Sequence, residues 1–264
     1  MQFQKLAIGA ILAISAQGFA NASQATPYRA DSHLNLVDYV ISQQRQLQAA
    51  QVKATRFKVR IENISTKDEF TASNGTKWTL DFSPGVWLIS SNNAPLFTPG
   101  QKDRGQGIEA IAEDGNPTNL AKALHSQKSV QSSGIFNTAV GATKAGGIRP
   151  GQAFEFTVTA SPGQKLSLVT MFGQSNDWFY APKSGIALFD ANGKPVQGNV
   201  TAQMGLWNAG TEVDEEPGIG ATQGPRQKAP NSGINENGVV QVVQDQAAYA
   251  QTTRLMRITI TPER

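Results

Sequence analysis

Two short segments contain the residue types that could do chemistry. Residues 174–182 (QSNDWFYAP) place amide, hydroxyl and carboxylate oxygens directly after an apolar stretch, and then continue into three consecutive aromatic residues. Residues 206–218 (LWNAGTEVDEEPG) include four carboxylates within the five positions 212–216, in a chain with only 16% charged residues. Carboxylates this close repel one another, so their charge must be offset.

Two offsets for this acidic segment are open. A divalent cation such as Ca²⁺ takes hard oxygen ligands from several loops, which is what the two segments offer. The alternative is a solvated acidic loop with Arg226 and Lys228 as its partners. Spacing alone favours the solvated loop, and it does not exclude the cation.

The composition excludes several classes of site. The 264 residues include no Cys and only two His, His33 and His125, which removes thiolate metal sites, disulfides and Cys nucleophiles and leaves few ways to build a catalytic triad. The sequence also contains no Gly-x-Ser-x-Gly motif, the turn that presents a nucleophilic serine in many hydrolases. The 23 basic and 20 acidic residues are scattered, so the charge pattern is not that of a nucleic-acid-binding protein.

Two motifs resemble ligand-binding loops but fit a structural role better. The segment 105–110 (GQGIEA) matches a loose dinucleotide-binding pattern, yet a loop and not a strand precedes it, so we interpret it as a flexible start to a helix. The segment 190–193 (DANG) begins like an EF-hand loop, but Pro195 and Thr201 occupy positions that require Gly and Glu. An Asn-Gly turn after a strand is the better interpretation.

Strands must position most of these residues. Apolar and polar residues alternate or run together in eight segments, which predict strands at 56–63, 77–82, 86–89, 153–158, 165–171, 186–189, 239–243 and 255–260. Helical spacing is confined to 32–52, with Ser32 as N-cap, and to two short helices within 105–125, the second ending at His125. Without alternating β and α units, we expect an all-β fold: an antiparallel β-sandwich with short helical insertions and one N-terminal helix.

The first 22 residues have the features of a secretory signal peptide. Lys5 precedes the apolar run 6–20, and Ala20-Asn21-Ala22 supplies a small-x-small cleavage pattern, so Ser23 is expected to begin the mature chain. Fifteen residues are too few to span a bilayer, and no later apolar run is long enough. The predicted organisation is a signal peptide at 1–22, an extension with a helix at 23–55 and one sandwich domain at 56–264, in a protein exported to the periplasm or the cell exterior.

The two segments 174–182 and 206–218 also resemble the spondin-N domain family. Residues 168–179, an apolar strand followed by SNDWF, and residues 208–212 (NAGTE) are similar to motifs of that family. Three further segments resemble the bacterial branch of the family: 107–117 (GIEAIAEDGNP), 151–156 (GQAFEF) and 212–218 (EVDEEPG). The resemblance extends over about 57–262.

This resemblance implies a β-sandwich related to C2 domains, with Ca²⁺ at one end and an extracellular binding or adhesion role. By motif it implies Asp177, Asn208 and Glu212 as metal ligands, with Asn208 where the family usually has Asp. One negative charge fewer in the site favours weak Ca²⁺ binding, on the order of 10⁻⁴–10⁻³ M.

The leading functional hypothesis is a noncatalytic, exported binding or adhesion module for an extracellular or envelope protein or glycan, without nucleic-acid binding or a membrane span. The alternative is a metal-assisted envelope hydrolase acting on a glycan or ester, and a third is a purely structural periplasmic domain. A deep cleft with a poised acid or base would favour the enzyme.

Overall fold

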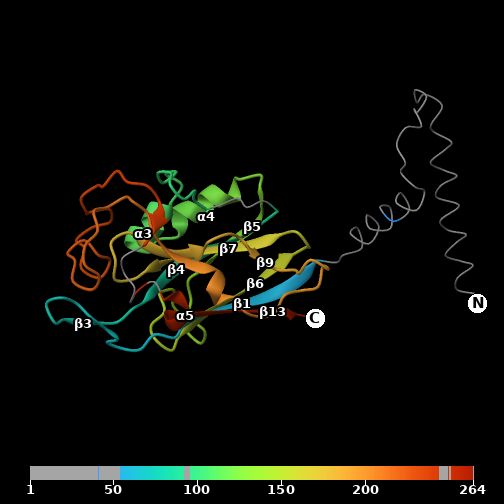
Figure 1. Cartoon of the computed structure of the whole chain (residues 1–264), viewed down its shortest axis with the longest axis horizontal. Coiled ribbons are helices and arrows are strands. Elements are labelled where there is room, and N and C mark those ends of the chain that lie inside the picture. The colour runs from blue at the N-terminus through green and yellow to red at the C-terminus, as the bar shows by residue number, and fades with distance from the viewer. Residues whose placement is uncertain (1–40, 42–53, 92–95, 244–248, 250, 264) are drawn as a thin grey trace, which may run out of the picture. The chain divides into compact units, whose positions relative to one another are not determined.

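The computed structural model describes residues 41, 54–91, 96–243, 249 and 251–263 (Figure 1). The chain divides into two units, Met1–Gln51 and Val52–Arg264. Ile41, the only described residue of the first unit, is helical. The rest of the helix predicted over 32–52, and the signal peptide predicted at 1–22, lie outside the described residues.

The second unit is an antiparallel β-sandwich, as the sequence predicts. Its smaller sheet has the strand order β10-β13-β1-β6, and every strand pair in it is antiparallel. The strands are β10 (Gly198–Asn199), β13 (Met256–Glu263), β1 (Thr55–Asn63) and β6 (Ala153–Ala160). The predicted alternation of β1 is confirmed, since Phe57, Val59 and Ile61 are buried while the residues between them are partly exposed.

The larger sheet has seven strands in the order β12-β11-β8-β7-β4-β5, with β9 also paired to β7. Their bounds are β12 (Gln241–Val242), β11 (Met204–Asn208), β8 (Trp178–Pro182), β7 (Lys165–Phe172), β4 (Phe82–Ser90), β5 (Val130–Phe136) and β9 (Ile186–Ala187). A separate hairpin joins β2 (Phe70–Thr71) to β3 (Lys77–Trp78).

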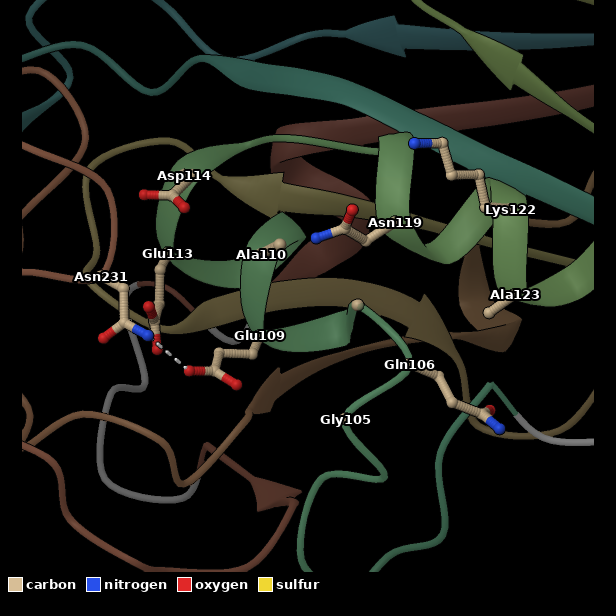
Figure 2. Close-up of a pocket in the computed structure, with 11 residues that line it drawn as sticks. Gly105, Gln106, Glu109, Ala110, Glu113, Asp114, Asn119, Lys122, Ala123 and Asn231 are labelled. Carbon is tan, nitrogen blue, oxygen red and sulfur yellow. Dashed lines mark hydrogen bonds between the residues drawn. The ribbon is translucent and has the colours of Figure 1, made fainter.

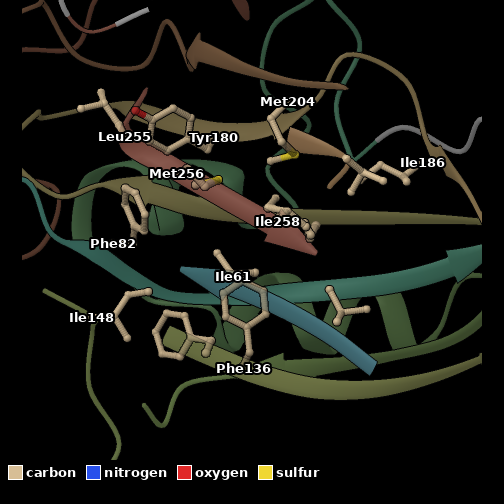
Figure 3. Packing of buried hydrophobic residues seen from close by; sticks show 14 of the residues in the cluster. Ile61, Phe82, Phe136, Ile148, Tyr180, Ile186, Met204, Leu255, Met256 and Ile258 are labelled. Carbon is tan, nitrogen blue, oxygen red and sulfur yellow. The ribbon is translucent and has the colours of Figure 1, made fainter. Parts of the chain in front are cut away.

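The strands β8 and β11 of the larger sheet are buried on both faces. Residues on one face, such as Tyr180 and Leu206, belong to a core shared with the smaller sheet (Figure 3), whereas their neighbours Phe179 and Trp207 belong to a second core. The second core is closed by α3 (Ile108–Asp114) and α4 (Thr118–His125), which contact β7 and β5 (Figure 1). The first of them, α3, also contacts β8, one of the strands that carry the candidate site.

Burial on both faces explains why the sequence pattern missed β8 and β11, whereas β5, which it also missed, is mostly exposed or partly exposed. All five residues of β8 and all five of β11 are buried, so neither strand shows alternation. The aromatic run Trp178-Phe179-Tyr180, which looked like part of a binding segment, is therefore the core portion of a strand.

Two sequence predictions about elements are wrong. Residues 77–82 are not one strand, because β3 ends at Trp78 and the backbone N–H of Phe82 turns to a new partner, the carbonyl of Ile148. A short helix, α5 (Thr252–Leu255), and a 3₁₀ turn, η1 (Thr201–Gln203), lie outside the two predicted helical regions. Elements of three or four residues are too short to show helical periodicity.

The two motifs adopt the local structures that the sequence predicts, a loop that leads into a helix and a turn. Gly107 has φ 113° and precedes the first residue of α3, and a Cβ there would lie 2.5 Å from the backbone nitrogen of Leu120 in α4. Residues 190–194 form a turn in which Asp190 accepts from the backbone N–H groups of Asn192 and Lys194, and Gly193 has φ 75°. In the part of the chain that the structure describes, no helix is long and apolar enough to cross a membrane.

Candidate metal centre

Asp177 lies at the point where the tight turn after β7 enters β8, and it is fully buried. The Ser175 hydroxyl accepts from the Trp178 N–H at 2.9 Å, which fixes the turn. Oδ2 of Asp177 accepts long hydrogen bonds from the backbone N–H groups of Thr211 and Glu212, at 3.3 and 3.4 Å. Oδ1 is buried with no N–H or O–H donor.

Asp214 is the charged neighbour of Asp177. Burial and, next, the nearby charge of Asp214 raise the pKa of Asp177 to about 8, and the hydrogen bonds from two backbone N–H groups only partly offset the rise. Near neutral pH, Asp177 therefore holds a proton that it can donate to the Asp214 carboxylate. The buried acid thus faces a second acid and not a cation.

Asn208, the last residue of β11, holds Asp214 in place. Its Nδ2 donates to Asp214 Oδ1 at 3.0 Å, and the Trp178 indole donates to the same oxygen at 2.7 Å. The amide oxygen of Asn208 accepts from the backbone N–H of Gly210 at 2.5 Å. Asn208 therefore contacts the acid pair through its nitrogen, while its oxygen closes the following turn.

Glu212 is 2% exposed and also directs its carboxylate to neutral donors. Oε1 accepts from the backbone N–H of Gly233 at 2.7 Å, and Oε2 accepts from Asn176 Nδ2 at 3.3 Å. The approach to Gly233 is so close that a Cβ there would lie 2.0 Å from Oε2. The structure thus brings the backbone of Glu212 to Asp177 and sends the Glu212 carboxylate toward the 231–235 loop.

The remaining acids of the segment 212–216 also have neutral partners. Glu215 accepts from the N–H of Ala221 and from the N–H and hydroxyl of Thr222, while Glu216 accepts from the N–H and hydroxyl of Ser73. These last two hydrogen bonds lower the pKa of Glu216. Side chains that diverge to separate donors thus relieve much of the repulsion that the sequence predicts.

Arg226 makes no close ion pair with the acidic segment, although the nearby charge of Glu215 acts on it: burial lowers the pKa of Arg226 and Glu215 raises it. Its guanidinium donates to the carbonyl of Gly220 and to the side-chain oxygens of Gln174 and Gln223. Between described residues, no ion pair reaches any acid of 212–216. The negative charge of the segment is therefore offset mainly by N–H and O–H dipoles.

The donor set fits a metal ion only as a weak site. Of the three predicted ligands, only Asp177 has a side-chain oxygen left without a donor. No group of three or more His, Cys, Asp or Glu side chains in the described ranges is arranged to hold a metal. Asp177 and Asp214 can supply two carboxylates, so most of the six to eight oxygens that Ca²⁺ takes would be carbonyls and water.

A second buried acid, Glu113 of α3, lies beside the same loop. It is 1% exposed, and neither carboxylate oxygen nor the Thr211 hydroxyl has a hydrogen bond of normal geometry. The pKa of Glu113 is raised to about 8, chiefly by burial and further by the charges of Glu212, Glu109 and Asp114, while the nearby Thr211 hydroxyl partly offsets the rise. Glu113 and Glu109 line a pocket of about 430 Å³ between the 105–107 loop, the two helices and Asn231 (Figure 2).

The sequence reasoning missed Asp214 and Glu113 as members of the site. Asp214 is one of the four clustered acids, and the sequence does not show which of the four lies beside Asp177. Glu113 lies in the segment 107–117 that carries part of the spondin-N resemblance, and the i, i+4 spacing of Glu109 and Glu113 would have placed both on one face of the predicted helix.

Compared with known proteins, the chain matches no protein-family model and no curated protein.

Proposed function

We propose that this chain is an exported, noncatalytic binding module of the spondin type, in which a weakly bound Ca²⁺ at Asp177 and Asp214 orders the loop end of the sandwich. The observation that carries the proposal is the buried Asp177, whose Oδ1 has no donor and whose charged neighbour is the carboxylate of the exposed residue Asp214. Such a pair either keeps a proton or takes up a cation.

The surroundings of the pair support a role in ordering loops. The Asp177 carboxylate touches the backbone at 211–212, and Asn208 and Trp178 both donate to Asp214. A cation between the two acids would therefore tie the turn before β8 to the loop after β11. Loops fixed by a rigid sandwich are a common place for a binding surface. Its partner would be an extracellular or envelope protein or glycan.

Calorimetric titration of the purified protein with Ca²⁺, after treatment with chelator, tests the metal. The expected dissociation constant is on the order of 10⁻⁴–10⁻³ M, and Mg²⁺ is expected to bind more weakly because it demands a tighter octahedral shell. At ten times that constant, Ca²⁺ should stabilise the fold by about 1.4 kcal/mol. Asp177→Asn should abolish most of this gain, whereas Glu263→Gln, at the far end of β13, should leave it unchanged.

Two results would overturn the metal proposal. One is the absence of Ca²⁺ binding up to roughly 10 mM, ten times the weak end of the expected range. The other is equal Ca²⁺ stabilisation of the parent protein and of Asp177→Asn, which would place the ion elsewhere.

A metal-assisted hydrolase is the second candidate, and the Glu113 pocket is the observation that favours it. A carboxyl group with a pKa of about 8 can act as a general acid near neutral pH, and Glu109 lies one helical turn away. Turnover of fluorogenic esters or glycosides that is lost in Glu113→Gln would support the enzyme. If the protein binds Ca²⁺ but turns over neither the esters nor the glycosides, the hydrolase is rejected and the binding module remains as the proposed function.

A further inference from the structure

The pocket beside α3 and α4 is lined by several acidic side chains, which form its floor. Glu109 and Glu113 project from the same face of α3, one turn apart, and Asp114 follows directly (Figure 2). Gly107, which precedes the first residue of α3, and Asn119, Lys122 and Ala123 of α4 also line the pocket. At about 430 Å³, the pocket lies in the usual size range of small-molecule sites.

The acid at the floor is buried without compensation. Glu113 is 1% exposed, and no described group makes a hydrogen bond of normal geometry to either of its oxygens. Glu109, by contrast, accepts from Asn231 Nδ2 at 3.0 Å (Figure 2). Burying a carboxyl group without a partner costs free energy, and the raised pKa of Glu113 reflects that cost. A donor from a ligand would remove it.

The lining distinguishes between kinds of cation. A metal ion alone would leave most of such a volume to water, and no three acids in the described ranges converge on one point. The methyl groups of Ala110 and Ala123 offer apolar contact for an alkyl stem. An ammonium head has three N–H donors and no acceptor, which matches the acceptors of the two glutamates.

We propose that this pocket binds a primary alkylammonium ion, with the ammonium group on Glu113 and Glu109 and the alkyl stem against Ala110 and Ala123. The ligand is either a free amine or a lysine side chain of a partner protein, since the two share this chemistry. The proposal goes beyond the Ca²⁺ function and does not require the metal.

Lys122 of α4 gives the proposal an internal check. It also lines the pocket, and no ion pair between described residues holds its ammonium group. Its positive charge opposes a second cation in the same cavity. Lys122→Gln should therefore strengthen binding of an alkylammonium ion, whereas loss of an acid should weaken it.

Binding can be tested by calorimetry and by amide chemical-shift changes on titration with n-butylammonium, with n-butanol as the neutral control. Nα-acetyl-lysine methylamide represents the protein-borne source, and the corresponding arginine compound tests the head group. All titrations are done with chelator and repeated with Ca²⁺. The expected result is millimolar or tighter binding of butylammonium, at least tenfold weaker binding of butanol, and shifts at residues 105–123.

Matched variants assign the effect to the floor of the pocket. Glu113→Gln should weaken butylammonium binding at least tenfold and Glu109→Gln should weaken it several-fold, whereas Glu263→Gln, the same change on the smaller sheet, should leave it unchanged. Because the amide resembles the protonated carboxyl group in shape, Glu113→Gln is expected to fold, and thermal unfolding checks this. Glu109→Gln gives an independent readout if it does not.

The proposal is overturned if Glu113→Gln and Glu109→Gln both bind butylammonium as the parent does, if butanol binds equally well, or if the arginine compound binds better than the lysine compound. Binding of the lysine compound as tight as that of the free amine assigns the source to a protein side chain, and weaker binding assigns it to a free amine. Amine binding without Ca²⁺ binding would reject only the metal proposal, and the reverse would reject only this one.

Discussion

On the outer face of the smaller sheet, Glu155 lies between Lys58 and Arg60, at 3.3 and 3.5 Å, with all three side chains about a third or more exposed. At the loop end of the larger sheet, Asp177 and Glu212 are almost fully buried, and their described partners are N–H groups. The first region pairs its acids with cations in water, whereas the second holds acids out of water without a cation. Burial without a counter-ion is costly, which makes the second region the place to look for a ligand.

The largest expected effect is the pH dependence of stability. Burial raises the pKa of Asp177 from 3.8 and that of Glu113 from 4.5, each to about 8. The folded state therefore holds two protons that the unfolded chain releases above pH 4 to 5, so stability is highest below those ordinary values. It should fall as pH rises toward 8, by up to about 1.4 kcal/mol per pH unit for each group.

Urea unfolding of metal-free protein between pH 5 and 9 measures this slope. Combining Asp177→Asn with Glu113→Gln should flatten the curve between pH 5 and 8, whereas Glu155→Gln should leave its shape unchanged. An unchanged slope in the combined variant would mean that the buried acids do not titrate in this window.

The next largest effect is expected from Trp178→Phe. The indole N–H donates to Asp214 at 2.7 Å, and the ring packs edge-on against Phe172 in the core. Loss of a hydrogen bond to a charged group, together with a partly filled cavity, should destabilise the fold by roughly 3 kcal/mol. Chemical denaturation measures the loss. Because Ca²⁺ at Asp177 and Asp214 would replace part of the missing interaction, added Ca²⁺ should restore part of the lost stability.

Asn208→Asp gives an intermediate effect whose sign depends on the metal. Without Ca²⁺, a carboxylate replaces the Nδ2 donor of Asp214, and the fold should lose about 1–3 kcal/mol. With Ca²⁺, the added charge should tighten binding and offset much of the loss. Paired melts in chelator and in Ca²⁺ check this prediction, and equal losses in both conditions would contradict it.

The same contrast shows what could be predicted from sequence. The exposed face of β1 alternates, so its strand and its buried residues Phe57, Val59 and Ile61 could be read directly. In β8 and β11 both faces are buried, the alternation disappears, and the strands were missed although their residues were singled out. Sequence patterns record which residues avoid water, and they record less well which of two buried faces a residue occupies.

The candidate site could be predicted in position but not in detail. Asp177, Asn208 and the backbone of Glu212 do meet at the end of the larger sheet. The direction of each carboxylate depends on donors distant in sequence, such as Gly233 for Glu212 and Ser73 for Glu216. Spacing along the chain carries no information about those donors, so the contact of Asp214 with Trp178 and Asn208 and the burial of Glu113 required the three-dimensional structure.

The smallest effect is expected where an acid already has cations in water. Glu155→Gln removes the partner of both Lys58 and Arg60, but Arg60 keeps Glu62 at 3.3 Å and all these side chains remain solvated. Exposed pairs of this kind contribute up to about 1 kcal/mol, and salt screens them. We expect a loss below 1 kcal/mol in urea unfolding at low ionic strength, shrinking further in 0.5 M NaCl. A loss as large as that of Trp178→Phe would remove the contrast between the two regions, because the exposed acids would then carry as much stability as the buried ones. Glu113→Gln, measured at pH 8, provides the opposite case. Removing the charge of Glu155 should destabilise the fold slightly, whereas removing that of Glu113 should stabilise it, because only the buried carboxylate lacks a partner when ionised.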